Sequence, residues 1–150
     1  MTAPPSSAPA PAAAQVALGM RLLAEPRLSA DGTRSCLSCH QPERGFTDGA
    51  VVQPGGLNTP TLWGLSERKR FGWFRPDVTS LEQMALLPLA DPAEMGPQQD
   101  TTLDRLRADP ALRAAYQAAF PDADEAITWA HTAQALATAI RTLEPPVSVY

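Results

Sequence analysis

Two cysteines and a histidine in one short run are the residues of this chain most able to do chemistry. Cys36, Cys39 and His40 form a C-x-x-C-H pattern within the run CLSCH. Thiols at this spacing can each form a thioether bond to a vinyl group of haem, and the adjacent imidazole can bind the iron as an axial ligand. The sequence therefore predicts one covalently attached haem c per chain, with His40 as the iron ligand.

Two other kinds of site also use a closely spaced cysteine pair. A thioredoxin-like redox pair would lie in a βαβ unit, and no such pattern surrounds Cys36 and Cys39. A structural zinc ion needs four ligands, but the chain contains only two cysteines and two histidines. Because His131 is the single remaining candidate ligand, zinc is disfavoured and haem is the preferred interpretation.

Length and charge narrow the classes of function. The chain has 150 residues, enough for one domain with a buried core, and its formal net charge is −4. It has no basic patch suited to nucleic acid and no apolar stretch of about 18 residues that could span a bilayer. We therefore expect neither a nucleic-acid partner nor a membrane span.

The haem motif also predicts where the protein works. Attachment of haem c takes place on the outer side of bacterial cytoplasmic membranes, so we expect a periplasmic protein. A signal peptide is not recognisable, because the first residues lack a basic segment and a proper apolar segment. We expect the sequence to represent a mature or recombinant form, or part of a longer chain.

The N-terminal part of the chain shows a change of composition. Residues 1–14 are nearly all Ala, Pro and Ser, which favours a disordered lead-in, and residues 15–150 are expected to form a single c-type haem domain. Apolar residues at helical spacing predict a first helix that stops before Pro26. Frequent Gly and Pro over residues 40–74 predict a long irregular segment that wraps the haem.

Helical patterns return in the second half of the chain. Ser80 can cap a helix over residues 81–89, which Pro88 should kink or end. Three more helical segments are predicted: one through Leu103, Leu106 and Arg107 towards Pro110, one over residues 111–120, and one over residues 124–143. The predicted fold class is all-α, a cytochrome c-like haem domain with long irregular loops around the haem.

Five separated blocks form a wider pattern around the motif. They are LLAEPRLSADGTRSCLSCHQPERGFTDG, NTPTL, FGW, SLEQMALLPLADPAEMG and AIRTLEPPVSVY. In this order and at close to this spacing, they resemble the N-terminal half of the bacterial di-haem cytochrome c peroxidases and their MauG-like relatives. The resemblance covers about residues 15–150. The resemblance implies that this chain is the haem domain that reacts with hydrogen peroxide. In the family, the C-terminal haem domain takes electrons from a donor protein.

The resemblance implies catalytic roles for two residues above the haem. Glu94 matches the family's carboxylate that moves a proton between the two peroxide oxygens, and Gln83 matches the amide that orients peroxide or a water molecule. From the residues alone, Gln83 is also an ordinary exposed helix residue and Glu94 a solvated carboxylate near a loop.

The resemblance also implies electron transfer and calcium binding. Trp73 matches the tryptophan that relays electrons between the two haems, and Asn58 matches a side-chain ligand to a calcium ion between the two domains. Cys36, Cys39 and His40 match the thioether cysteines and the proximal iron ligand. Without the resemblance, Trp73 would be core packing and Asn58 a turn residue.

The chain departs from the family in three ways. Where the family usually reads Trp-Asp-Gly-Arg, this chain has Trp73-Phe74-Arg75-Pro76, so contacts made by that Asp and Arg are in doubt. There is no second C-x-x-C-H motif, so we expect the electron-entry haem and the remaining calcium ligands to be absent from this chain. A histidine that caps the resting haem in some relatives is also missing before Asn58, which favours a five-coordinate or water-bound iron.

Other side chains are alternative iron ligands. His131 falls on a polar face with Thr132, away from an apolar stripe that includes Ala130, so we expect it to face solvent. The methionines are conceivable sixth ligands of an electron-transfer cytochrome, although methionines at helical spacing more often fill gaps in a core. Among Met20, Met84 and Met95, the most plausible ligand is Met84.

The motif and the resemblance together predict a haem peroxidase domain. The expected reaction is two-electron reduction of hydrogen peroxide, or iron-based oxidation of a protein partner as in the MauG-like branch. Expected partners are a small electron-donor protein, such as a cytochrome or a copper protein, and a second haem domain. The alternatives are a monohaem electron-transfer cytochrome without peroxide chemistry, in which protein ligands would occupy both iron faces, and a fragment that works only when docked to a separate haem subunit.

Overall fold

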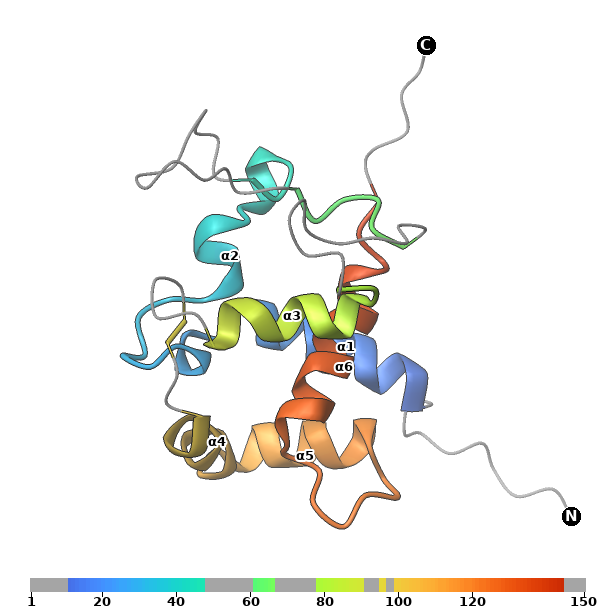
Figure 1. Ribbon diagram of the computed structural model, residues 1–150. Coiled ribbons are helices and arrows are strands. Elements are labelled where there is room, and N and C mark those ends of the chain that lie inside the picture. Colours follow the sequence, from blue (N-terminus) through green and yellow to red (C-terminus); the bar gives the residue numbers. More distant parts are fainter. Residues whose placement is uncertain (1–10, 48–60, 67–77, 91–94, 97–98, 145–150) are drawn as a thin grey trace, which may run out of the picture.

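The computed structural model describes residues 11–47, 61–66, 78–90, 95–96 and 99–144. Over these residues it contains helices and no strand, apart from one isolated bridge between Gln41 and Thr47, so the predicted all-α fold class is confirmed (Figure 1). The α-helices are α1 (Pro11–Leu23), α2 (Cys36–Cys39), α3 (Leu81–Ala90), α4 (Gln99–Arg107), α5 (Pro110–Ala119) and α6 (Trp129–Ile140). Two 3-10 helices, η1 (Pro26–Leu28) and η2 (Pro42–Arg44), flank α2.

The centre of the domain is the packing of α1 against α6. In Figure 1 these helices cross in the middle of the molecule, with α3 over them, α5 and α4 on one side, and α2 on the other. Their contact surfaces are apolar, and full burial of a leucine side chain contributes about 1.5–3 kcal/mol. The best-buried side chains of these helices, each at most 2% exposed, are Leu18, Leu22, Leu23, Leu106, Leu112, Tyr116 and Leu136.

Prolines and capping residues set the helix ends much as predicted. The first helix ends at Leu23, before Pro26, but it begins at Pro11, so its first turn uses residues that the composition placed in the lead-in. The helix α5 begins directly after Asp109, whose carboxylate accepts hydrogen bonds from the backbone N–H groups of Ala111 and Leu112.

Two of the predicted helices have limits that differ from expectation. Pro88 lies inside α3, which continues to Ala90, so the proline does not end the helix at once. Helix α6 covers only residues 129–140 of the predicted 124–143, because the Thr128 hydroxyl accepts a hydrogen bond from the His131 N–H and caps the first turn there.

The predicted faces of α6 were partly wrong. Ala130 is exposed, whereas Thr132 is fully buried, with its hydroxyl 2.7 Å from the Tyr116 hydroxyl and donating to the Thr128 carbonyl oxygen. Two hydrogen-bond partners remove the cost of burying this hydroxyl. Burial raises the pKa of Tyr116 to about 12.

His131 does not simply face solvent, as the polar pattern predicted. It is half-buried, and its ring stacks on Phe120 with centroids 4.1 Å apart and 12° between the planes. Its Nδ1 donates to the Ala126 carbonyl oxygen at 2.8 Å. His131 therefore acts in packing at the start of α6.

No helix in the described part of the chain is long and apolar enough to cross a membrane.

Candidate haem site

The haem motif lies on a single helical turn. Helix α2 consists of the four residues Cys36–Cys39, and the three-residue separation puts both cysteines on one side of the turn. The Ser38 hydroxyl oxygen accepts a hydrogen bond from the Ser35 N–H at 3.0 Å, and the His40 N–H donates to the Cys36 carbonyl oxygen at 2.9 Å. These local bonds hold the two thiols and the imidazole within the five residues of one turn and its C-cap.

Both thiols are in the state that haem attachment requires. Cys36 and Cys39 are not joined in a disulfide; Cys36 is half-buried against the core and Cys39 is exposed. A thioether bond needs a thiol that is not held in a disulfide, so this donor pair fits haem c.

The imidazole of His40 is oriented by a backbone carbonyl that sequence reasoning missed. Nδ1 of His40 lies 3.0 Å from the carbonyl oxygen of Phe46. Because a carbonyl oxygen only accepts, Nδ1 must carry the proton, and this tautomer places the lone pair on Nε2. An imidazole that ligates a metal commonly donates its other N–H to a carbonyl group in this way. No sequence pattern identifies Phe46, since it contributes a main-chain atom.

The surroundings of the motif are apolar and incompletely covered. Leu37 on α2, Leu62 in the 61–66 segment, and Met84 and Leu87 on α3 pack against the core but are only partly buried. In Figure 1, α2 and residues 61–66 lie on the same side of the central helices, and α3 lies over these helices. Partly covered apolar side chains on α2, residues 61–66 and α3, together with the two thiols of α2, suit a large, flat, apolar cofactor, so the residues present fit haem.

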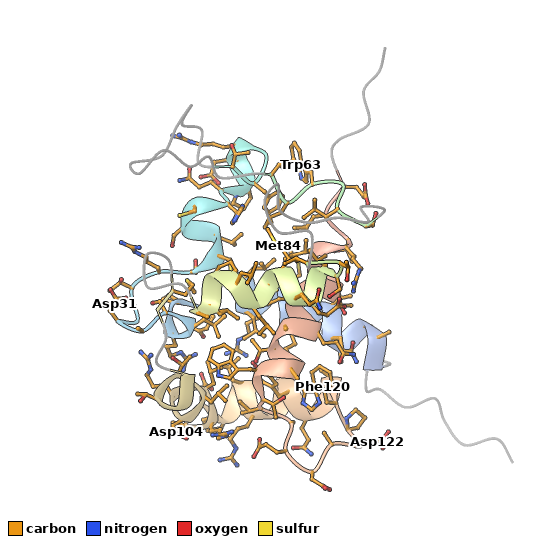
Figure 2. All side chains as sticks on the ribbon, viewed as in Figure 1. Asp31, Trp63, Met84, Asp104, Phe120 and Asp122 are labelled. Carbon is orange, nitrogen blue, oxygen red and sulfur yellow. The ribbon has the colours of Figure 1, made fainter. Side chains whose placement is uncertain are left out.

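The three methionines considered as iron ligands differ in their environment. Met20 is 43% exposed, Met95 is 5% exposed and buried in the core, and Met84 is half-buried on α3 (Figure 2). Met84 is therefore the one of these three methionines that packs against the core while remaining partly exposed.

Gln83 lies in the first turn of α3 and is exposed. Its backbone N–H donates to the Ser80 hydroxyl at 3.1 Å, and its side-chain Oε1 accepts from the Thr79 N–H at 2.9 Å. The predicted cap at Ser80 is confirmed, and Gln83 completes a variant of the capping box. One function of the Gln83 amide is thus to fix the start of α3.

The neighbouring carboxylate ties α3 to α6. Arg141 donates two hydrogen bonds to Glu82, at 2.7 and 2.9 Å. These bonds with Arg141 hold the pKa of Glu82 below its usual value and keep it ionised. The pair fixes the first turn of α3, on which Gln83 lies.

Residues 13–150 match the protein family described as di-haem cytochrome c peroxidase. This chain belongs to that family. The family binds c-type haem, which agrees with the thiols and imidazole on the turn of Cys36–His40.

Relatives of this member of the di-haem cytochrome c peroxidase family include a MauG protein and a cytochrome c peroxidase. The chain is 37% identical to the methylamine utilization protein MauG of Methylorubrum extorquens over 151 residues, which covers 93% of this chain and 42% of MauG. It is 33% identical to the cytochrome c peroxidase Ccp of Escherichia coli, covering 73% of this chain and 25% of Ccp.

A solved structure shares the fold as well. The crystal structure of a MauG-like protein associated with microbial copper homeostasis is 34% identical, with a TM-score of 0.81, over 95% of this chain and 43% of the other. The chain thus spans less than half the length of these relatives.

The remaining residues that the family resemblance predicted are Asn58, Trp73 and Glu94. All three lie outside the described residues. Among the residues that are described, no group of three or more His, Cys, Asp or Glu side chains could hold a metal ion.

Proposed function

We propose that this chain is the peroxidatic haem domain of a di-haem cytochrome c peroxidase or MauG-like enzyme and reduces hydrogen peroxide. Cys36 and Cys39 would hold the haem covalently and His40 would bind its iron. The haem, when bound, supplies the electron-accepting and electron-donating chemistry that cleaves the peroxide bond. The observation that carries the proposal is the hydrogen bond from His40 to the Phe46 carbonyl oxygen, which prepares Nε2 as a ligand.

The protein's own residues manage the proton and the position of the substrate. Glu94 would take a proton from one peroxide oxygen and return it to the leaving oxygen, a role that requires a carboxylate within hydrogen-bond reach of the substrate. Gln83 would orient peroxide through its amide nitrogen, because its amide oxygen is already bonded to Thr79.

The other half of the reaction is delivery of electrons. Trp73 would relay electrons from a second haem domain, and Asn58 would contribute an amide oxygen to a calcium ion between the domains. A small cytochrome or copper protein of the periplasm would be the electron donor. Oxidation of a protein partner, as in the MauG-like branch, would use the same peroxide site.

The test uses the haem-loaded chain, produced in a periplasm with the haem-maturation machinery. Stopped-flow absorbance with hydrogen peroxide should show a fast reaction, and the ferric protein should bind cyanide readily because one iron face is open. Sustained turnover with a donor should be poor until a separate second-haem domain and calcium are added.

Two outcomes would contradict the proposal. A low-spin ferric spectrum with a methionine-to-iron charge-transfer band and no reaction with peroxide would identify a monohaem electron-transfer cytochrome, with Met84 as the first ligand to test. Efficient sustained turnover by this chain alone would show that no second haem domain is needed.

A further inference from the structure

The turn that follows the haem motif is held in an unusual backbone conformation. Gly45 and Phe46 are consecutive residues in the left-handed region, with φ values of 66° and 59°. This region is ordinary for glycine but unfavourable for a bulky side chain. Over the described part of the chain, Phe46 is the only residue other than glycine with a positive φ. A conformation of this kind persists only where the surroundings impose it.

In this conformation both main-chain polar groups of Phe46 form hydrogen bonds. Its N–H donates to the Gln41 carbonyl oxygen at 2.8 Å, and its own carbonyl oxygen accepts from His40 Nδ1 at 3.0 Å. The Gln41 N–H in turn donates to the Thr47 carbonyl oxygen at 3.0 Å. If Phe46 relaxed to a right-handed conformation, the carbonyl group would rotate away from the imidazole.

The turn has little packing of its own to resist that relaxation. Neither α2 nor η2 contains a fully buried residue; Cys36 and Leu37 of α2 pack against the core but are only partly buried, and no residue of η2 does so. Further restraint on the turn comes from another segment of the chain.

Residues 61–63 supply that restraint. The Thr61 hydroxyl donates to the Gly45 carbonyl oxygen and accepts from the Trp63 N–H at 3.1 Å. The Trp63 indole meets the Phe46 ring edge-on, with centroids 6.0 Å apart and 72° between the planes. It also covers Gly45 closely, since a Cβ at that position would lie 3.0 Å from the indole. Figure 2 shows Trp63 beside the segment that carries η2.

The restraining segment is itself fixed to the helical core. The Gly64 N–H donates to the Leu143 carbonyl oxygen at 3.0 Å, and the Ser66 hydroxyl donates to Glu144 at 2.9 Å, just beyond the end of α6. Leu65 between them is 8% exposed. A continuous set of contacts therefore runs from the end of α6, through Trp63, to the turn behind His40.

We infer that Thr61 and Trp63 are positioning residues for the iron ligand. They hold Phe46 in its left-handed conformation, so that its carbonyl oxygen continues to accept the hydrogen bond from the His40 Nδ1–H group. This inference rests on the proposed role of His40 as the axial ligand. A firm Nδ1–H hydrogen bond increases the electron density at Nε2 and so strengthens its bond to a metal. Loosening the turn should weaken the bond between His40 and the haem iron and raise the reduction potential of the haem.

The experiment compares haem-loaded wild type with Trp63→Leu and Thr61→Val. Resonance Raman spectra of the ferrous state report the iron–histidine stretching frequency, and redox titration reports the midpoint potential. Both variants should shift the stretching frequency downward and the potential upward, with Trp63→Leu giving the larger shift. Trp63→Phe, which restores an aromatic edge against Phe46, should recover part of both shifts.

Trp129→Phe is the matched control, because it also alters a half-buried tryptophan but at the far end of α6. It should leave frequency and potential as in wild type. If Trp63→Leu is too unstable to study, Thr61→Val and Trp63→Phe still decide the question. Lower thermal stability with unchanged frequency and potential would overturn the inference, since Trp63 would then only pack. Absence of an iron–histidine band in wild type whose ferrous haem is high-spin would instead contradict the role of His40.

Discussion

Gly19 on α1 lies against the carbonyl group of Ala135 on α6, so closely that a Cβ atom added to Gly19 would sit 2.0 Å from the Ala135 oxygen. The same atom would be 2.6 Å from Cβ of Ala139. One obstacle is main chain and the other is a buried methyl group, so neither can move without displacing α6. The crossing of the two central helices therefore depends on the absence of a side chain at residue 19.

Replacing Gly19 with valine should force the two helices apart. Insertion of atoms into a packed core typically costs about 1–3 kcal/mol. Because the added atoms would clash with the backbone of α6, we expect a loss of unfolding free energy of about 3 kcal/mol. Denaturant unfolding followed by circular dichroism measures it. Ala17→Val, on the same helix at an exposed position, should cost under about 1 kcal/mol. Equal losses for both variants would show that helix propensity, not the close approach, is responsible.

Acid should destabilise the protein through a carboxylate that is ionised and buried. Glu25 is 8% exposed and accepts hydrogen bonds from the side chain and the N–H of Arg27, which also donates to Asp109 at 2.9 Å. The hydrogen bond with Arg27 holds the pKa of Glu25 below its ordinary value of 4.5. A carboxyl group whose pKa is lower in the folded state stabilises the fold above its unfolded-state pKa and loses that contribution as pH falls through the folded value.

The free energy of unfolding should therefore fall as pH drops below 4.5. Glu25→Gln removes the ionisable group, so the variant should be less stable than wild type at neutral pH but show a shallower loss in acid. Denaturant unfolding from pH 7 to about 3 measures both effects. Asp122→Asn, at an exposed site, should follow the wild-type curve. An unchanged acid slope in Glu25→Gln would assign the acid sensitivity to other carboxylates.

Local signals in the sequence predicted the helices well, and the attachment residues are read from an equally local motif. Pro26, Ser80 and Asp109 act on the backbone within a few residues, so their effect on helix ends can be read without the tertiary structure. The C-x-x-C-H motif is equally local, because its three functional groups share one turn.

Features that depend on distant residues were not predictable. Thr132 is buried because its hydroxyl forms a hydrogen bond with the Tyr116 hydroxyl on α5, and the pattern of polar residues within α6 cannot reveal that partner. The carbonyl group that orients His40 depends on the backbone of Phe46, which residues 61–63 hold in place. The direction of the Phe46 carbonyl group depends on the backbone conformation, and the identity of a side chain carries little information about that conformation.

Covalent haem attachment should depend on all three motif residues in different ways. The wild-type chain should retain one haem after acid–acetone extraction. Cys36→Ala and Cys39→Ala should each leave one thioether bond at most and lower the yield of haem-loaded protein, whereas His40→Ala should change the spin state of the iron even where attachment survives. His131→Ala should keep both the attachment and the absorption spectrum, since His131 packs on Phe120. Haem lost on extraction from wild type would contradict the assignment of the site.

The last prediction separates two functions of Gln83. Its Oε1 bonds the Thr79 N–H and fixes the start of α3, while the proposed peroxide site needs its amide nitrogen. Gln83→Glu keeps an oxygen acceptor for Thr79, so α3 and the melting temperature should be preserved while the donor to peroxide is lost. Gln83→Ala removes both and should also cost about 1 kcal/mol, as for loss of a helix cap.

Glu94→Gln sets the scale for these variants in stopped-flow measurements with hydrogen peroxide. Removal of a positioned acid–base group typically slows a reaction by about a hundredfold or more, so Glu94→Gln should show at least that loss, and Gln83→Glu a smaller one. If Gln83→Glu reacts like wild type while Gln83→Ala is slow and less stable, Gln83 acts only by capping α3. A slow reaction of Gln83→Glu with an unchanged melting temperature would support a role of the amide group at the peroxide site, because the cap on α3 would then be intact.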